Sequence, residues 1–143
     1  MIPRPRYRDI EPGTALPAHK QTLRRADLVR YAAASGDLNT IHWDERAAHD
    51  VGLPDVIAHG MLTMGIAMRA VTHWSVDPGA IVSCGCRFAR PVVVPHDSDG
   101  VEIIVEGTVT EKLDAPRVRV ELVVRCGADK VLTRSNAIVA LEG

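Results

Sequence analysis

Residues 60–74 read GMLTMGIAMRAVTHW, and this stretch decides the fold. Its apolar side chains cover essentially every side of a helical wheel, which is typical of a helix that is buried on all sides. Gly60 begins this predicted helix and Trp74 ends it. The rest of the chain must therefore supply the layer that surrounds it.

Downstream of Pro78 and Gly79 the spacing of apolar residues changes from the helical period to a period of two, which is typical of strands. Four strands are predicted, over residues 82–88, 101–110, 117–124 and 131–141, with turns at 114–116 and 127–129. The predicted helices thus come first in the chain, and strands joined by short turns follow them. We expect an α+β fold in which an antiparallel sheet with one apolar face wraps around the helix.

Upstream of the helix, residues 1–19 contain four prolines and predict an extended arm. Thr22 is a plausible N-cap for a first helix over residues 23–35, which Gly36 ends. A short second helix is expected after Asp44, a good N-cap residue, and before Gly52 and Pro54.

Length and composition narrow the class of protein. The 143 residues suit a single domain, 1–143, with 46% hydrophobic residues and 17 basic against 18 acidic side chains. This balance excludes most disordered chains and gives no electrostatic footprint for nucleic acid, while 3% aromatics argue against base stacking. No apolar run approaches roughly 18 residues and the N-terminus lacks a signal-peptide core, so we expect a soluble, cytoplasmic protein with no membrane contact.

The three cysteines do not suggest a disulfide framework. Cys84 and Cys86 would share one face of a strand, where small thiols pack as buried apolar groups. A metal site at this pair would need further ligands at suitable spacing.

A polar loop precedes the apolar segments: residues 35–42 read SGDLNTIH. Gly36, Asp37 and Asn39 are ordinary turn formers, and residue types alone favour that interpretation, with His42 a satisfied histidine. The alternative is that Asp37 and His42 converge on one water as an acid/base pair.

A second stretch, residues 57–61, lies at the start of the predicted buried helix and reads IAHGM. Gly60 would let a ligand approach the main chain, and free N–H groups at a helix N-terminus suit a developing oxyanion. Tight packing of the helix on the sheet explains Gly60 equally well. His59 is expected to order the loop rather than transfer protons.

Motifs for other chemistries are missing. The sequence has no Walker P-loop, G-x-G-x-x-G, H-E-x-x-H or G-x-S-x-G motif, and no serine or cysteine has the context of a nucleophile. His42, His49 and His59 with Asp37 or Asp44 match no standard metal-site spacing, so no metal is predicted.

Together these stretches resemble the MaoC-like, (R)-specific enoyl-thioester hydratase/dehydratase family. The resemblance covers nearly the whole chain. Its strongest parts are Tyr31 with residues 35–42 and Ala48, then residues 58–62, Arg87-Phe88 and Pro91-Val92, and the opening residues 7–10 with Gly13. Residues 57–65 and 77–80 most resemble the catalytic subunits of (3R)-hydroxyacyl-ACP dehydratases.

The resemblance implies a single hotdog domain, in which a curled antiparallel sheet surrounds a central helix. It implies a hydro-lyase that interconverts trans-2-enoyl and (R)-3-hydroxyacyl thioesters of coenzyme A or acyl carrier protein, without a metal or redox cofactor. Asp37 and His42 would be the catalytic pair, the Gly60 N–H would hold the thioester carbonyl, and Asn39 and His59 would support the loop. A homodimer, or a heterodimer with a second hotdog subunit, is the implied assembly.

Two positions depart from the family pattern. Thr40 stands where proline is usual, and Val93-Val94-Pro95 follows Pro91-Val92 where Gly-Asp is common. Neither change touches the implied pair. Two alternatives remain: a non-catalytic acyl-binding subunit, which would have no need of Asp37 and His42, and a hotdog thioesterase, which would more naturally carry a carboxylate on the central helix.

Overall fold

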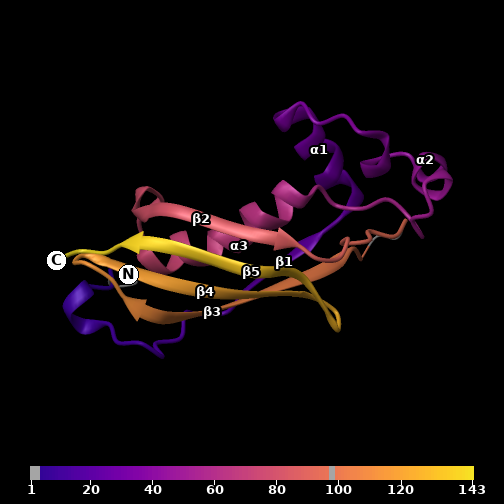
Figure 1. Ribbon diagram of the computed structural model, residues 1–143. Helices are drawn as coiled ribbons and strands as arrows, with labels where there is room; N and C mark the ends of the chain where they lie inside the picture. The colour runs from indigo at the N-terminus through magenta and orange to yellow at the C-terminus, as the bar shows by residue number, and fades with distance from the viewer. Residues whose placement is uncertain (1–3, 97–98) are drawn as a thin grey trace.

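The computed structural model describes residues 4–96 and 99–143, which form a curled antiparallel sheet and one long helix on its concave side (Figure 1). The strands lie in the order β1-β3-β4-β5-β2. In chain order the elements are η1 (Tyr7–Asp9), β1 (His19–Leu23), α1 (Arg25–Ser35), η2 (Thr40–His42), α2 (Glu45–Asp50), α3 (Gly60–Ser75), η3 (Pro78–Ala80), β2 (Ile81–Phe88), β3 (Val101–Lys112), β4 (Arg117–Cys126) and β5 (Asp129–Ala140).

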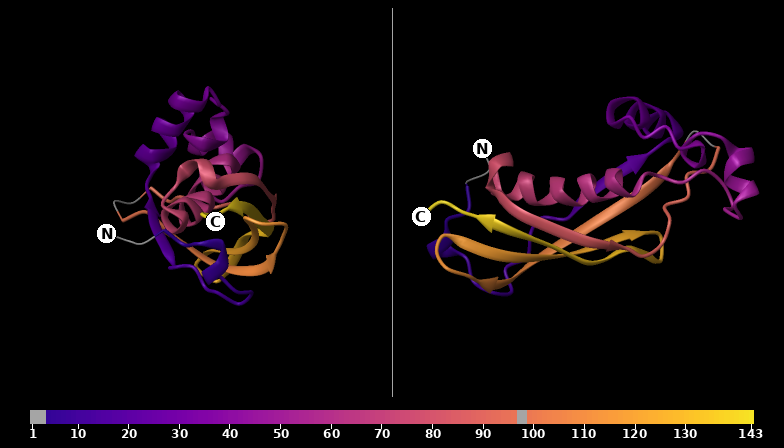
Figure 2. Two further views of the ribbon diagram at one scale, coloured as in Figure 1. Left: turned by 90° about the vertical axis from the view of Figure 1, so that its left-hand side faces the viewer. Right: turned by 45° about the horizontal axis from the view of Figure 1, so that its top comes forward.

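The core forms where α3 lies along the concave face of the sheet (Figure 2). The views of Figure 2 place α1 and α2 together at one end of α3, clear of most of the sheet. Alternation along β3 and β4 turns one side of each strand toward α3, so the predicted curled antiparallel sheet around a central helix is confirmed. The central contributors to this core are Ile66, Ala67, Ala70 and Val71 from α3, with Ile103, Val105, Val109, Val118, Val120 and Val124 from the sheet.

One side of α3 stays open, so the prediction that this helix is buried on all sides is wrong for the single chain. Met61, Gly65, Arg69 and His73 are exposed, and their spacing of four residues places them on one side of the helix. A sheet of five strands covers only part of the circumference of α3. The apolar residues on the remaining side are available to another surface.

The start of the chain also differs from the prediction. Thr22 does not cap a helix: it lies in β1, which pairs antiparallel with β3 from His19 opposite Val105 to Leu23 opposite Val101. The helix predicted from residue 23 instead begins at Arg25, and the sheet has five strands rather than four. Only Leu23 of β1 is fully buried, so this strand leaves no apolar alternation in the sequence.

The predicted N-terminal arm, residues 1–19, is extended except for η1 and a turn at Pro12–Gly13, as far as it is described. His19 already belongs to β1, and residues 1–3 lie outside the described residues. The arm is held at the far end of the sheet, because Tyr7 N–H donates to Glu142 O at 2.7 Å and its hydroxyl donates to Leu113 O at 2.8 Å.

The strand β2 lies at an edge of the sheet and pairs only with β5. The prediction that Cys84 and Cys86 are both buried is wrong, because Cys84 is exposed and Cys86 is half-buried. Their position at an edge, with register shifts on both sides of Ser83–Gly85, explains the difference. Partial burial, with the neighbouring Cys84, raises the pKa of Cys86.

Two helix boundaries set by single residues were predicted correctly. Gly36 ends α1 in the left-handed conformation, with φ of 76°. The Asp44 carboxylate caps α2 by accepting from the N–H groups of Arg46 and Ala47. No helix in the described ranges has the length and hydropathy needed to cross a membrane.

Replacing Ile66 with alanine should lower the free energy of unfolding by about 2 to 4 kcal/mol, because the side chain is 2% exposed and the change leaves a cavity between α3 and the sheet. Urea denaturation followed by circular dichroism measures this. Val29→Ala, at a position that is 55% exposed on α1, is the control and should change stability by less than about 0.5 kcal/mol. Equal effects of the two changes would contradict the assignment of the core.

Candidate active site

The polar loop between α1 and η2 is held by a series of side-chain to main-chain hydrogen bonds. Asp37 Oδ1 accepts from the Asn39 N–H at 3.2 Å, and Asn39 Oδ1 accepts from the Ile41 N–H at 3.2 Å. These are the local bonds that make Asp and Asn frequent in turns. They fix one oxygen of Asp37 to the loop and leave Oδ2 free.

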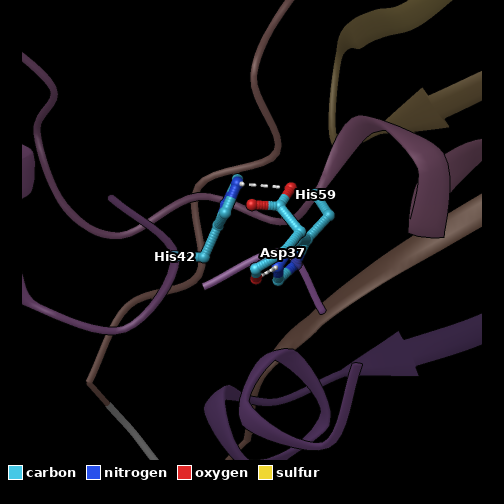
Figure 3. A group of neighbouring side chains, drawn as sticks. All are labelled: Asp37, His42 and His59. Carbon is cyan, nitrogen blue, oxygen red and sulfur yellow. Dashed lines mark hydrogen bonds and ion pairs between the residues drawn. The ribbon is translucent and has the colours of Figure 1, made fainter. Parts of the chain in front are cut away.

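The ring of His42 is buried beside this free carboxylate oxygen. Its Nδ1 lies 2.6 Å from Ile57 O, and because a carbonyl oxygen only accepts, Nδ1 carries the proton of this bond. Neutral His42 therefore has its lone pair at Nε2. That atom lies 3.9 Å from Asp37 Oδ2. A dashed line joins the two side chains in Figure 3. At 3.9 Å the two groups are not directly hydrogen-bonded, and one small molecule can contact both.

His59 lies directly against this pair, as the N-cap residue of α3. Its Nε2 is 3.1 Å from Asp37 O, and its ring is stacked on His42 with centroids 3.7 Å apart and 22° between the planes (Figure 3). Tyr31 of α1 packs on the same ring at 4.8 Å. Burial lowers the pKa of His59, and the nearby His42 lowers it further, although the Asp37 main chain and carboxylate oppose the shift.

The first residue of α3, Gly60, supplies a different group. No residue in the described ranges accepts a hydrogen bond from its main-chain N–H, as is usual in the first turn of a helix. A Cβ atom at this position would lie 3.0 Å from the Phe88 ring. Glycine thus lets β2 pack closely against the start of α3.

These groups open onto one cavity of about 480 Å³. Apart from the polar groups near Asp37, most of its wall is apolar. The lining residues are Asp37, His42, Ile57, Ala58, His59, Gly60, Met61, Thr63, Phe88, Ala89, Arg90, Pro91, Val92, Val131 and Leu132. A cavity of this size with a few convergent polar groups suits a small, largely apolar ligand.

The site can therefore perform acid/base chemistry on a bound water. A carboxylate oxygen and an imidazole nitrogen face the same point, and a helix N-terminus with a free N–H lies on the same cavity. Proton transfer by such a pair and hydrogen bonding to a developing oxyanion are the two standard contributions of groups of this kind.

Asp37, His42 and His59 also place one potential ligand atom each within 4.8 Å of the others, which is the spacing of a metal site. His42 Nδ1 and His59 Nε2 are occupied by carbonyl oxygens, and His59 Nδ1 is shielded from solvent. A catalytic metal usually has three accessible protein ligands. Asp37 and His42 Nε2 supply two.

The structure thus brings together Asp37, His42, Gly60 and His59, the residues that the family resemblance singled out, and Asn39 bonds within the same loop. Their catalytic roles stay a prediction. The wider set considered for a metal is not brought together: His49 bonds to Pro54 O, and Asp44 caps α2.

Sequence reasoning placed Tyr31 in a helix and Phe88 in a strand and counted both in the family resemblance, but it gave neither of them, nor Arg25, a contact at the site. The contacts that Tyr31 and Phe88 make join segments far apart in the chain. Phe88 is the one phenylalanine of the chain, but a single aromatic residue does not reveal its partner.

Arg25 joins the segments that carry the site. Its side chain, 21% exposed, bonds to Glu45 at 2.6 Å, to Asp55 at 2.5 Å and to Val94 O at 2.9 Å. Beyond Asp55, the chain is held by main-chain bonds from Ile57 to residue 41 and from Ala58 to residue 92. Arg25 therefore fixes α1, α2 and the approach to α3 relative to one another.

Comparison with known proteins shows which family this chain is similar to. The profile of the MaoC like domain matches residues 9–125. The chain is 31% identical over 135 residues to 3-hydroxybutyryl-CoA dehydratase of Methylorubrum extorquens, covering 93% of this chain and 82% of that protein. It is 38% identical over 85 residues to 3-hydroxyacyl-thioester dehydratase X of Mycobacterium tuberculosis, covering 59% of this chain.

Solved structures agree with the sequence matches. A MaoC-like dehydratase superimposes with a TM-score of 0.92 at 36% identity over 97% of this chain, and R-hydratase PhaJ1 of Pseudomonas aeruginosa with 0.82 at 31% over 96%. PhaJ1 is covered to 86% of its length. The chain spans only 43% of the MaoC-like dehydratase, and 29% of dehydratase X.

Replacing Arg25 with glutamine should lower the free energy of unfolding by about 2 to 4 kcal/mol, because Asp55 and Val94 O lose a shared, largely buried partner. Thermal and urea unfolding measure the change. Arg30→Gln removes an ion pair from the exposed face of the same helix and should cost less than about 0.5 kcal/mol. If both substitutions cost the same, Arg25 does not hold these segments together.

Proposed function

The chain belongs to the MaoC-like domain family, and on this basis we propose that it is a hydro-lyase acting on acyl thioesters. The reaction is the reversible hydration of a trans-2-enoyl thioester to the (R)-3-hydroxyacyl thioester. Relatives named 3-hydroxybutyryl-CoA dehydratase and R-hydratase support this choice. The observation that carries it is the placement of Asp37 Oδ2 and His42 Nε2, 3.9 Å apart, on an apolar cavity that Gly60 also lines.

In the hydration direction, Asp37 and His42 bind and orient one water. The water oxygen forms a bond to C3 of the substrate as one member of the pair accepts a proton from it. The electrons of the C2=C3 bond move toward the thioester. The proton taken from the water then passes from the Asp37/His42 pair to C2 on the same face, which returns the pair to its starting state. Dehydration is the reverse, so the reaction moves no net electrons and needs no redox cofactor.

The thioester carbonyl oxygen gains negative charge as the carbon–carbon double bond is broken. The Gly60 N–H, unpaired within the described residues and at the positive end of α3, is the proposed donor to this oxygen. One such donor is worth roughly 3 kcal/mol of transition-state stabilisation. Its value depends on being fixed before reaction, which packing of Phe88 against Gly60 provides.

The acyl group is proposed to lie along the apolar wall of the cavity, toward Val92, Val131 and Leu132. The carrier, coenzyme A or an acyl carrier protein, would remain outside. Arg90, which lines the cavity and pairs with exposed Asp129 at 3.6 Å, lies where a carrier would pass.

The two alternative functions fit the site less well. A hotdog thioesterase would carry its carboxylate on the central helix, and α3 contains none. A subunit that only binds the acyl chain has no use for a carboxylate and an imidazole held 3.9 Å apart.

We further propose that the working assembly is a pair of hotdog units, in which a second copy of this chain joins at β2. Edge strands present unpaired main-chain groups that can continue a sheet, and β2 is such an edge. Two apolar groups near this edge, Phe88 and the start of α3 at Met61, are 52% and 59% exposed. Pairing there would cover both, beside the mouth of the cavity.

The assay for the proposed activity is spectrophotometric hydration of crotonyl-CoA and longer trans-2-enoyl-CoA substrates by the purified chain. Asp37→Asn and His42→Ala should each lower kcat roughly 10²- to 10⁴-fold, because each removes one member of the acid/base pair. Asp50→Asn and His73→Ala, exposed and outside the cavity, should retain the activity of the unsubstituted chain. Wild-type activity in both Asp37→Asn and His42→Ala would refute the site; a chain that hydrates no enoyl thioester, alone or with a second subunit, would refute the function.

The assembly has its own test at Gly65. A Cβ at this exposed position of α3 meets no atom within 4 Å, so Gly65→Glu should fold normally but place a charge on the open side of the helix. In light scattering after size exclusion, the unsubstituted chain should be a dimer and Gly65→Glu a monomer. A monomeric unsubstituted chain would contradict self-pairing and favour a different partner subunit, and a dimeric variant would place the contact elsewhere.

A further inference from the structure

His59 is the most deeply buried titratable side chain of the site, yet the proposed reaction gives it no proton to transfer. It is 2% exposed, between α1 and the η2 segment, and contacts both members of the proposed pair. Its Nε2 bonds to the main chain of Asp37, and its ring covers that of His42. A residue with two such contacts controls the separation of the pair.

The hydrogen bonds determine the tautomer of each ring. Because Asp37 O only accepts, His59 Nε2 carries the proton of that bond. His59 Nδ1 is buried and has no hydrogen-bond partner among the described residues, so a second proton there would be an unsatisfied buried donor. His42 has the opposite arrangement, with its proton on Nδ1 and its lone pair at Nε2.

The groups around His59 also favour the neutral form of its ring. The titratable groups that face His59 are Asp37, His42 and Tyr31. Burial is the largest influence on its pKa and lowers it, and a proton on His42 at 3.7 Å centroid separation lowers it further. Of the two stacked rings, that of His42 is the one whose free nitrogen, Nε2, faces the Asp37 carboxylate.

We propose that His59 is a positioning residue that stays neutral throughout the reaction. Its ring and its Nε2–H hold the His42 ring and the Asp37 main chain in the geometry in which one water contacts both. Only the expected effect of His59 on the reaction rate rests on the proposed function. The charge and tautomer of His59 follow from the fold and can be measured without any substrate.

The first experiment is ¹⁵N NMR of the unsubstituted chain with labelled histidines, in which His59→Gln identifies the His59 signals. His59 should show a protonated Nε2 and an unprotonated Nδ1, and should remain neutral through the ordinary value of 6.5. His42 should show the opposite tautomer. Titration of His59 near 6.5, or a proton on its Nδ1, would overturn the proposal even in a chain with no measurable activity.

The second experiment compares three substitutions that separate the two contacts. His59→Gln keeps an N–H at the reach of Nε2 without the ring, His59→Phe keeps the ring without the N–H, and His59→Asn keeps neither. Because a displacement of about 1 Å can cost about 10²-fold, His59→Asn should lower kcat about 100-fold, and Gln and Phe about 10-fold each. KM for the enoyl thioester should change by less than about threefold, since none of the contacts is to the carrier.

His49→Phe is the matched control, because it makes the same substitution at an exposed position of α2, outside the cavity. It should leave kcat and KM unchanged. If His59→Asn retained the kcat of the unsubstituted chain, or if the three variants lost activity only through a raised KM, His59 would not be a positioning residue.

Discussion

The packing of α3 against the concave face of the sheet is the interaction on which the rest of the structure depends. Burial of Ile66 and Val71 fixes the axis of the helix, and this in turn fixes its N-terminus. His59 and Gly60 lie at that end, and Phe88 at the end of β2 packs on it. The tip of this core element therefore fixes His59 and Gly60, while Asp37 and His42 lie on the polar loop and η2 segment that meet it. Rigid elements are better suited than loops to hold groups within the tolerances that catalysis needs.

Hydrogen bonds between side chains and the main chain are the second feature that determines the geometry of the site. Carbonyl oxygens of Ile57 and Asp37 each hold one imidazole, while the Asn39 and Ile41 N–H groups bind the oxygens of the turn. Such bonds select one tautomer of each ring, a choice that side-chain packing alone does not make. Arg25 stabilises this arrangement from outside by fixing the segments on which these carbonyls lie.

Much of the fold could be predicted from the sequence, because its periodic patterns are strong: α3, the last three strands and the cap at Asp44 all followed from local patterns. The strand β1 could not be predicted, since four of its five residues are polar or exposed and its pairing with β3 is a tertiary effect. The open side of α3 could not be predicted either. The spacing of apolar residues indicates that a side chain becomes buried, but not whether its own chain or another one covers it. At the site, residue types alone left Asp37 and His42 as turn formers or as a pair, and family resemblance favoured the pair. No sequence pattern indicated the stacking of His59 or the contacts of Arg25, since each joins segments that are distant in the sequence.

The two members of the proposed pair differ greatly in access to solvent: the side chain of Asp37 is 53% exposed and that of His42 is 8% exposed. The pair therefore meets solvent mainly through the carboxylate, while His42 reaches it through the cavity that both residues line. The carboxylate would therefore serve as the site's connection to the buffer, passing protons in and out between turnovers. When an acyl chain fills the cavity, that connection would narrow to one face of Asp37. In the proposed reaction, the pair would then keep the proton taken from water long enough to return it to the same substrate molecule.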